Sequence, residues 1–321
     1  MRALQISQYG GPEVLKIQEV RIGKPGKDQA LIRIQAAGVN FIDVYQRRGI
    51  YPVKLPYIPG LEGSGIVEAI GEGVTHVKVG DRVAYVHEPG SYAQQCLVMA
   101  QHLIPLPSEL SFEQGAAFPL QGMTAHYLLH EFRKVKTGDV VLIHAAAGGM
   151  GLLLVQWAKH LGARVLGTTS SAEKAQSAQE AGADGVIIYT KQDFVSEVKR
   201  LTHNHGADLI IDGVGKTTFA GNMEAAALHG NIVIFGAASG PADPISPNAF
   251  MKRSLTVSGG SLFNYLLSTE DLLTRARAVL EGIQKGWLHL RIDQVFPLEQ
   301  ASQAHQKLEE RKSTGKLLLI P

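Results

Sequence analysis

The sequence has 321 residues, 45% of them hydrophobic, and a formal net charge of +2. This length suits two domains or one large α/β unit with a full core. The charges form no basic cluster, so nothing favours binding to nucleic acid or to an anionic membrane. No apolar run reaches the ~18 residues of a membrane span, and the chain opens on a strand-like segment, so we expect a cytoplasmic rather than an exported protein.

Residues 1–100 contain short alternating segments separated by glycine and proline, which is typical of a barrel-like all-β unit. The predicted strands are 3–6, 15–20, 29–37, 65–70, 82–85 and 92–98. The single cysteine, Cys96, excludes an internal disulfide and is expected to be a buried strand residue. The segment from Gly38 to Pro52 departs from the alternation and predicts a loop and a short helix, with Asp43 near its start. Loops that interrupt a β scaffold often carry the chemistry.

Residues 110–135 change to helical periodicity and predict a bridge into a region where strands and helices alternate. Such alternation indicates a doubly wound parallel sheet. The predicted strands are 140–144, 164–168, 185–189, 207–212, 231–235 and 255–259, with intervening helices that include 172–181, 193–202 and 217–228. The remaining segments, helices 269–285 and 298–312 with a last strand 316–320, do not continue the alternation and are expected to complete the first domain.

The stretch from Val140 to Ser171 has the strand, tight turn, helix and second strand of a βαβ unit. Its turn is a variant of the dinucleotide fingerprint, with Ala146 at the first glycine position. Small residues let the backbone approach a pyrophosphate, and free N–H groups at the positive helix end face the anion. The alternative is a purely structural glycine turn. The residues expected to contact the pyrophosphate are Ala147, Gly148, Gly149, Met150 and Gly151.

The end of the second strand is where an acidic residue would hold the adenosine ribose of NAD. This chain has hydroxyl side chains there and no carboxylate at the strand end, so a ribose phosphate could accept hydrogen bonds and pair with a lysine. The pattern favours NADPH over NADH; the alternative is an ordinary serine N-cap with a solvated lysine. The expected phosphate site comprises Thr169, Ser170, Ser171, Lys174 and Tyr189, of which the tyrosine could also cover the adenine.

Five segments closely resemble the zinc-free quinone oxidoreductases, also called the zeta-crystallin type, of the medium-chain dehydrogenase/reductase superfamily. They are GVNFIDVYQRRGIYP, PYIPGLEGSGIVEAIGEGVTHVKVGDRVAY, LQGMTAHYLL, HAAAGGMGLLLVQWAKHLGA and the closing GKLLLIP. The resemblance runs from end to end. It implies an α/β protein with a split, β-rich GroES-like catalytic domain, residues 1–122 and 262–321, and a Rossmann domain, residues 123–261. It also implies NADPH-dependent reduction of quinones and a homodimer whose nucleotide-binding sheets join near Leu255 to Gly259.

Zinc members of the superfamily need a cysteine near position 40 and a His-Glu pair after the PG turn. This chain has Asn40 at the first position and Leu61 before Glu62 at the second. Four-coordinate zinc cannot be assembled from these residues, so no metal is expected.

Quinone reduction suggests roles for individual side chains, and the resemblance favours these roles for Asn40 and Tyr45 but not for Tyr51. Asn40 would orient the nicotinamide side or the acceptor oxygen, and Tyr45 would pack on the ring or donate a hydrogen bond. Tyr51 would line the acceptor site, and Thr124 would fix the cofactor from the linking helix. The alternatives are a loop-capping asparagine and core tyrosines.

Candidates for the nicotinamide side are Phe235, Gly236 and Ser261. Asp212 is interpreted as a strand-end residue that makes local backbone bonds. Gln121 leaves the preferred acceptor open.

Two other functions fit the same sequence. An NADPH-dependent reductase of 2-enals or enoyl thioesters would need a proton donor, for which Tyr51 or Tyr45 could serve. A non-catalytic NADPH- or RNA-binding protein is the third reading, and the lack of a basic stripe argues against RNA. We therefore expect a small-molecule partner, a quinone or another activated carbonyl or alkene, and no nucleic acid.

Overall fold

The computed structural model describes all 321 residues. The chain divides into two compact units. Unit 1 comprises Met1–Leu120, Leu266–Arg277 and Leu290–Pro321, and unit 2 comprises Gln121–Tyr265 and Ala278–His289. No helix combines the length and the apolar character that a membrane span requires.

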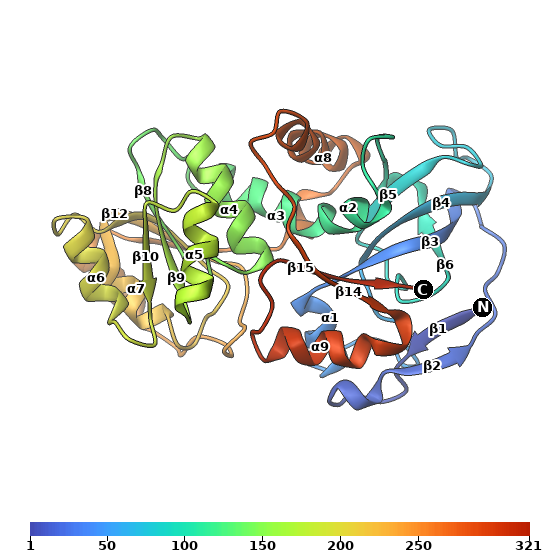
Figure 1. Ribbon diagram of the computed structural model, residues 1–321, viewed down its shortest axis with the longest axis horizontal. Coiled ribbons are helices and arrows are strands. Elements are labelled where there is room, and N and C mark those ends of the chain that lie inside the picture. Colours follow the sequence, from blue (N-terminus) through green and yellow to red (C-terminus); the bar gives the residue numbers. More distant parts are fainter. The chain divides into compact units, whose positions relative to one another are not determined.

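Unit 1 is built on a seven-stranded sheet with the order β14-β15-β3-β4-β5-β7, in which β6 also pairs with β3 (Figure 1). These strands are β3 Gln29–Val39, β4 Glu62–Ile70, β5 Arg82–Val86, β6 Gln95–Met99, β7 Leu103–Pro105, β14 Ile292–Pro297 and β15 Lys316–Ile320. All pairs are antiparallel except β14 with β15. A separate hairpin joins β1 Arg2–Gln5 to β2 Lys16–Glu19. The predicted β-rich unit, completed by the C-terminal strands, is confirmed.

Apolar side chains of the strands form the core of unit 1. Ile32 and Ile34 on β3 pack with Val98 on β6 and with the buried ring of Tyr85 on β5. Cys96 on β6 is buried and free, as predicted. Helices α1 Phe41–Arg47, α2 Phe112–Ala117 and α9 Ala301–Glu309 belong to the same unit.

The strand register of unit 1 brings three strand ends together. Leu317 on β15 pairs with Val39 on β3, and Ala37 on β3 pairs with Gly63 on β4. Continued by one residue, the same registers set Lys316 opposite Asn40 and Glu62 opposite Gly38. Polar residues from distant parts of the chain therefore meet where β3 ends and α1 begins.

Unit 2 contains a six-stranded, all-parallel sheet with the order β10-β9-β8-β11-β12-β13. The strands are β8 Val140–Ile143, β9 Arg164–Thr169, β10 Gly185–Ile188, β11 Ala207–Asp212, β12 Ala226–Ile234 and β13 Thr256–Gly259. The order reverses between β8 and β11, as in a Rossmann fold, and a dinucleotide binds at such a reversal. The predicted doubly wound parallel sheet is confirmed.

The helices of unit 2 pack in neighbouring pairs, α4 with α5 and α6 with α7 (Figure 1). They are α4 Gly149–His160, α5 Ala172–Glu180, α6 Phe194–Leu201 and α7 Phe219–Ala225. Two further helices, α3 Pro119–His130 and α8 Thr269–Gln284, extend over segments assigned to both units.

The predicted helix 217–228 is wrong at its end. Helix α7 ends at Ala225, and Ala226 has extended dihedral angles and begins β12. Ala226 pairs with Ala207 at the start of β11, and both side chains are fully buried. Alanine is the best helix former, but helix propensity amounts to less than about 1 kcal/mol per residue, and pairing in a buried sheet overrides it.

Candidate functional site

The turn between β8 and α4 exposes unpaired backbone donors. Ala145 adopts a positive φ of 53° and turns the chain out of the strand. Gly148 then caps α4 with extended dihedral angles, and its own N–H donates to the Ala145 carbonyl oxygen at 2.9 Å. The next three N–H groups, of Gly149, Met150 and Gly151, start the helix and have no partner inside it. Together with the helix dipole they suit a pyrophosphate.

Two glycines allow this turn to be tight. A Cβ on Gly151 would lie 2.3 Å from the Ala145 carbonyl oxygen and 2.6 Å from backbone atoms of Ala146, which cannot move without rebuilding the turn. A Cβ on Gly167 of β9 would lie 2.6 Å from the Cβ of Ala146. Gly167 thus makes room for the alanine that stands at the first fingerprint position.

The end of β9 presents the predicted hydroxyl groups, although they differ in accessibility. Thr169 is only 2% exposed, and its hydroxyl donates to the Ser171 carbonyl oxygen at 3.4 Å. Ser171 is the N-cap of α5, and its Oγ accepts from the Lys174 backbone N–H at 3.3 Å. Ser170 and the side chain of Lys174 are half-buried. The ring of Tyr189, at the end of β10, is 43% exposed, and its backbone N–H donates to Thr169.

Asp212 at the end of β11 accepts local backbone bonds, as predicted. Its Oδ1 accepts from the N–H groups of Val214 and Gly215 at 2.7 and 3.1 Å. The ring of Phe235 lies over Gly213, where an added Cβ would meet it at 2.7 Å. Gly236 follows in the same loop, and Ser261 is exposed after β13.

A buried chain of hydrogen bonds lies at the strand ends of unit 2. Asn222 Nδ2 donates to Asp212 Oδ2 at 2.7 Å, so Asn222 Oδ1 faces His144 Nε2, also at 2.7 Å. The Nδ1 atom of His144 therefore accepts from the Thr168 hydroxyl at 3.0 Å. Burial lowers the pKa of His144, which favours the neutral ring. Sequence reasoning missed His144, although it directly precedes the turn.

In unit 1, Asn40 joins a buried ion pair. Its Nδ2 donates to Glu62 Oε1 at 2.7 Å, and its Oδ1 accepts from Lys316 Nζ at 2.8 Å. Lys316 also pairs directly with Glu62. The side chains of Lys316 and Glu62 are 2% and 0% exposed. The side chain of Asn40, the N-cap residue of α1, therefore bonds to a carboxylate and to an ammonium.

These residues do not fit a zinc ion. The amide oxygen of Asn40 and the carboxylate of Glu62 already face an ammonium, which carries only donors. Zinc takes thiolate, imidazole and carboxylate ligands, and only the carboxylate is present among these three residues. No group of three or more His, Cys, Asp or Glu residues in the structure could hold a metal ion.

Tyr45 and Tyr51 pack edge to face, with ring centroids 5.2 Å apart. Tyr45 on α1 is half-buried, and Tyr51 is 48% exposed. The Tyr51 backbone N–H donates to the Tyr45 carbonyl oxygen at 3.2 Å, which holds the loop after α1 against the helix. Thr124 belongs to unit 2, on α3, and is 7% exposed.

Unit 1 also contains a buried chain of hydrogen bonds. The sequence analysis did not predict it and singled out only Asp43 among its members. Arg47 Nη1 can only donate, so His305 Nδ1, 3.2 Å away, accepts. His305 Nε2 then donates to the Tyr92 hydroxyl at 3.1 Å, and that hydroxyl donates to Asp43 Oδ2 at 3.0 Å. Asp43 Oδ2 also accepts from the Asn40 backbone N–H at 2.8 Å. The chain thus ends at the residue that binds the ion pair.

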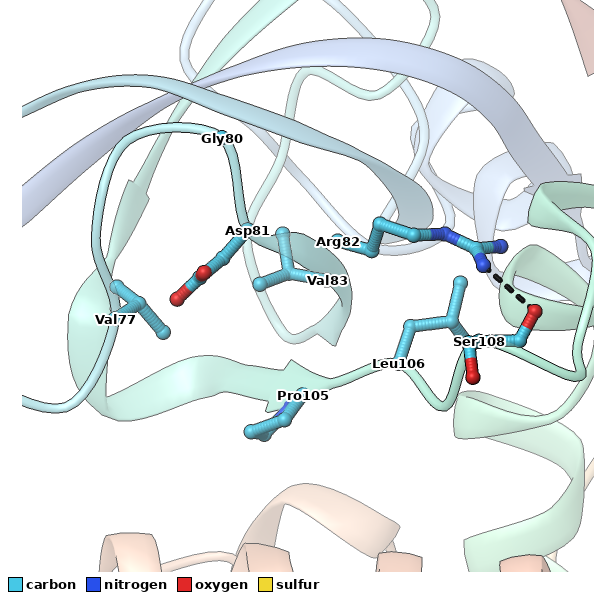
Figure 2. Close-up of a pocket in the computed structure, with 8 residues that line it drawn as sticks. All are labelled: Val77, Gly80, Asp81, Arg82, Val83, Pro105, Leu106 and Ser108. Carbon is cyan, nitrogen blue, oxygen red and sulfur yellow. Dashed lines mark hydrogen bonds between the residues drawn. The ribbon is translucent and has the colours of Figure 1, made fainter.

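A shallow hollow of about 420 Å³ lies elsewhere in unit 1, between the ends of β5 and β7 (Figure 2). At its edge the Arg82 guanidinium donates to the Ser108 carbonyl oxygen at 2.9 Å and lies over the ring of Phe112. None of the site residues predicted from the sequence lines this hollow.

Two family models match the chain. Residues 26–133 match the alcohol dehydrogenase GroES-like domain, and residues 149–277 match a zinc-binding dehydrogenase. The fold and the nucleotide turn therefore define a medium-chain dehydrogenase/reductase.

Full-length relatives narrow this class. Quinone oxidoreductase from Pseudomonas aeruginosa is 40% identical over 100% of this chain and 99% of its own length. A 2-haloacrylate reductase from a Burkholderia species is 39% identical over 99% and 98%. The solved structure of Escherichia coli quinone oxidoreductase complexed with NADPH is 37% identical and covers both chains completely with a TM-score of 0.97. The chain belongs to the quinone oxidoreductase family, as its motifs predicted, and is an oxidoreductase.

Proposed function

We propose that this chain catalyses the NADPH-dependent reduction of quinones without zinc. The observation that carries the proposal is the geometry of the turn between β8 and α4, in a chain that matches a quinone oxidoreductase over 99% of that relative's length. Unpaired N–H groups begin α4, and the end of β9 offers hydroxyl groups and Lys174 in place of a carboxylate. These residues fit NADPH: the helix end would bind the pyrophosphate, and Ser170, Ser171 and Lys174 would bind the 2′-phosphate.

NADPH supplies a hydride from carbon 4 of its nicotinamide when it is bound. A quinone that accepts the hydride becomes a hydroquinone anion, which takes one proton from water, so no protein acid is needed. The protein then has to hold and orient the acceptor and exclude water. We assign acceptor orientation to Asn40 and Tyr45, with Tyr51 lining the site. Thr124, Phe235, Gly236 and Ser261 would hold the nicotinamide end of the cofactor.

A second function, reduction of an activated alkene, is supported by the 39% identity to a 2-haloacrylate reductase. This reaction requires a proton at the α carbon of the substrate. A tyrosine hydroxyl of the Tyr45 and Tyr51 pair would be the donor.

Parallel titrations with NADPH and NADH, followed by cofactor fluorescence, test the cofactor. Contacts to the phosphate should make NADPH bind at least ~10-fold more tightly. Lys174→Ala should remove this preference, whereas Lys199→Ala, which breaks a surface ion pair with Glu224 on α7, should leave it intact. Equal binding of the two cofactors by the unmodified protein would refute the phosphate site.

Addition of 1,4-benzoquinone to the NADPH complex tests the reaction. Rapid oxidation of NADPH is the expected result. Turnover with a 2-enal or 2-chloroacrylate but not with the quinone would replace quinone reduction by alkene reduction.

We also propose a cytoplasmic homodimer that joins at β13. This strand is at the edge of its sheet and pairs only with β12, so its outer edge is available to a second copy. Light scattering after size-exclusion chromatography measures the mass of the protein in solution and so tests the dimer. The domain boundaries, 1–122 with 262–321 and 123–261, stay a prediction.

A further inference from the structure

The carboxamide of Asn40 has only one stable orientation. Its oxygen faces the Lys316 ammonium at 2.8 Å, and its nitrogen faces Glu62 Oε1 at 2.7 Å. An ammonium can only donate and a carboxylate can only accept. A flipped amide would therefore place its NH₂ group against the ammonium and its oxygen against the carboxylate. Lys316 and Glu62 together fix which end of the amide faces which partner.

The backbone around this pair is adapted to hold it. Glu62 Oε2 accepts from the Leu120 backbone N–H at 2.8 Å, so both carboxylate oxygens are bonded. A Cβ on Gly38 would lie 2.2 Å from Glu62 Oε1, so only glycine leaves room for the carboxylate. Lys316 comes from β15, 276 residues from Asn40, through the register of three strands.

A buried ion pair is weak evidence for stability, because desolvation opposes the attraction between the charges. It can instead select one geometry. We propose that Lys316 and Glu62 are positioning residues for the reduction, which hold the Asn40 carboxamide so that its second Nδ2–H donates to the acceptor oxygen. Lys316 also polarises the amide through Oδ1, which strengthens that donor. This inference rests on the proposed function, because it requires a bound acceptor.

A double-mutant cycle in the full-length protein tests the inference, with steady-state oxidation of NADPH by 1,4-benzoquinone as the readout. The first change is Asn40→Ala, and the second is Lys316→Met. Because Lys316→Met leaves Glu62 buried and unpaired, the neutral combination Lys316→Met with Glu62→Gln is made in parallel. In that combination the amide oxygen introduced by Glu62→Gln can still accept from Asn40. Lys307→Met, which removes a lysine from the half-buried ion pair with Asp293, is the matched control.

Asn40→Ala and Lys316→Met should each lower kcat/KM by roughly tenfold to hundredfold, because a misplaced catalytic group costs that much. If Lys316 acts through Asn40, its loss should cost less than about twofold in the Asn40→Ala background. NADPH affinity should be unchanged in every variant, and Lys307→Met should retain full activity. Losses that multiply in the double variant, or loss of NADPH binding with activity, would overturn the inference and assign the ion pair a structural role.

Failure of the proposed function and failure of this inference give different results. If the unmodified protein reduces a 2-enal instead of the quinone, the cycle is run with the 2-enal and the same non-additivity is expected. If the unmodified protein oxidises NADPH with neither acceptor, the proposed function fails and this inference fails with it.

Discussion

The hydroxyl of Tyr92 donates a hydrogen bond to the carboxylate of Asp43 at 3.0 Å, and neither side chain is exposed. Asp43 lies in the first turn of α1, where its carboxylate also accepts from the Asn40 backbone N–H. These two bonds stabilise the charged form, but burial outweighs them. The pKa of Asp43 is raised from 3.8 to about 7, mainly by desolvation.

This shift predicts how Asp43 contributes to stability. Because the folded protein holds the proton more tightly than the unfolded chain, the contribution is fully present below about pH 4 and is lost as the pH rises through about 7. Asp43→Asn should remove this dependence. The free energy of unfolding of the unmodified protein should fall relative to the variant by at most about 4 kcal/mol over that range. Urea unfolding at several pH values measures the difference, and a constant difference would contradict the assignment.

His305 should have the opposite dependence on pH. Burial, followed by the positive charge of Arg47, lowers the pKa of His305 to about 3. The unfolded chain then binds a proton that the folded protein excludes, so stability is present above about pH 6.5 and is lost as the pH falls. At about pH 5 the loss should reach about 2 kcal/mol, and His305→Gln should abolish it. Unfolding midpoints of the unmodified protein and of His305→Gln at about pH 7.5 and pH 5 provide the test. Equal losses of stability in the two proteins would refute the prediction.

The nucleotide turn could be predicted because it is local. Strand, turn and helix follow one another within about 30 residues, and each has its own residue pattern. The close packing of the Ala146 Cβ against Gly167 could not be predicted, because it depends on how β8 and β9 lie side by side. The same holds for Lys316 and Asn40, and for His305, which is 213 residues from Tyr92. Such contacts depend on strand register and helix packing, which are fixed by the whole fold.

The nucleotide turn should tolerate a methyl group at one glycine and not at another. Gly151→Ala would drive a Cβ into backbone atoms of Ala145 and Ala146, and should cost at least about 2 kcal/mol of stability. Gly149→Ala is the matched control. There the Cβ would meet only the end of the Gln121 side chain, at 2.6 Å, which can rotate away. Thermal unfolding of the two variants compares the costs, and equal costs would show that backbone crowding does not decide them.

The buried chain of hydrogen bonds in unit 2, from Thr168 to Asp212, should depend on Asn222. This residue is fully buried and joins His144 to Asp212, at 2.7 Å on each side. Asn222→Leu keeps the approximate shape but leaves the His144 N–H without an acceptor, since the neutral ring already uses Nδ1 to accept from Thr168.

The expected loss is about 2 to 4 kcal/mol, because a buried donor loses its partner and a carboxylate loses one of its donors. Asn231→Leu removes a single bond to the Phe132 carbonyl oxygen at a half-buried position and should cost less than about 1.5 kcal/mol. Chemical unfolding of both variants gives the comparison. Equal losses would mean that the chain from Thr168 to Asp212 stabilises the sheet no more than one ordinary hydrogen bond, and that the neutral His144 finds another acceptor.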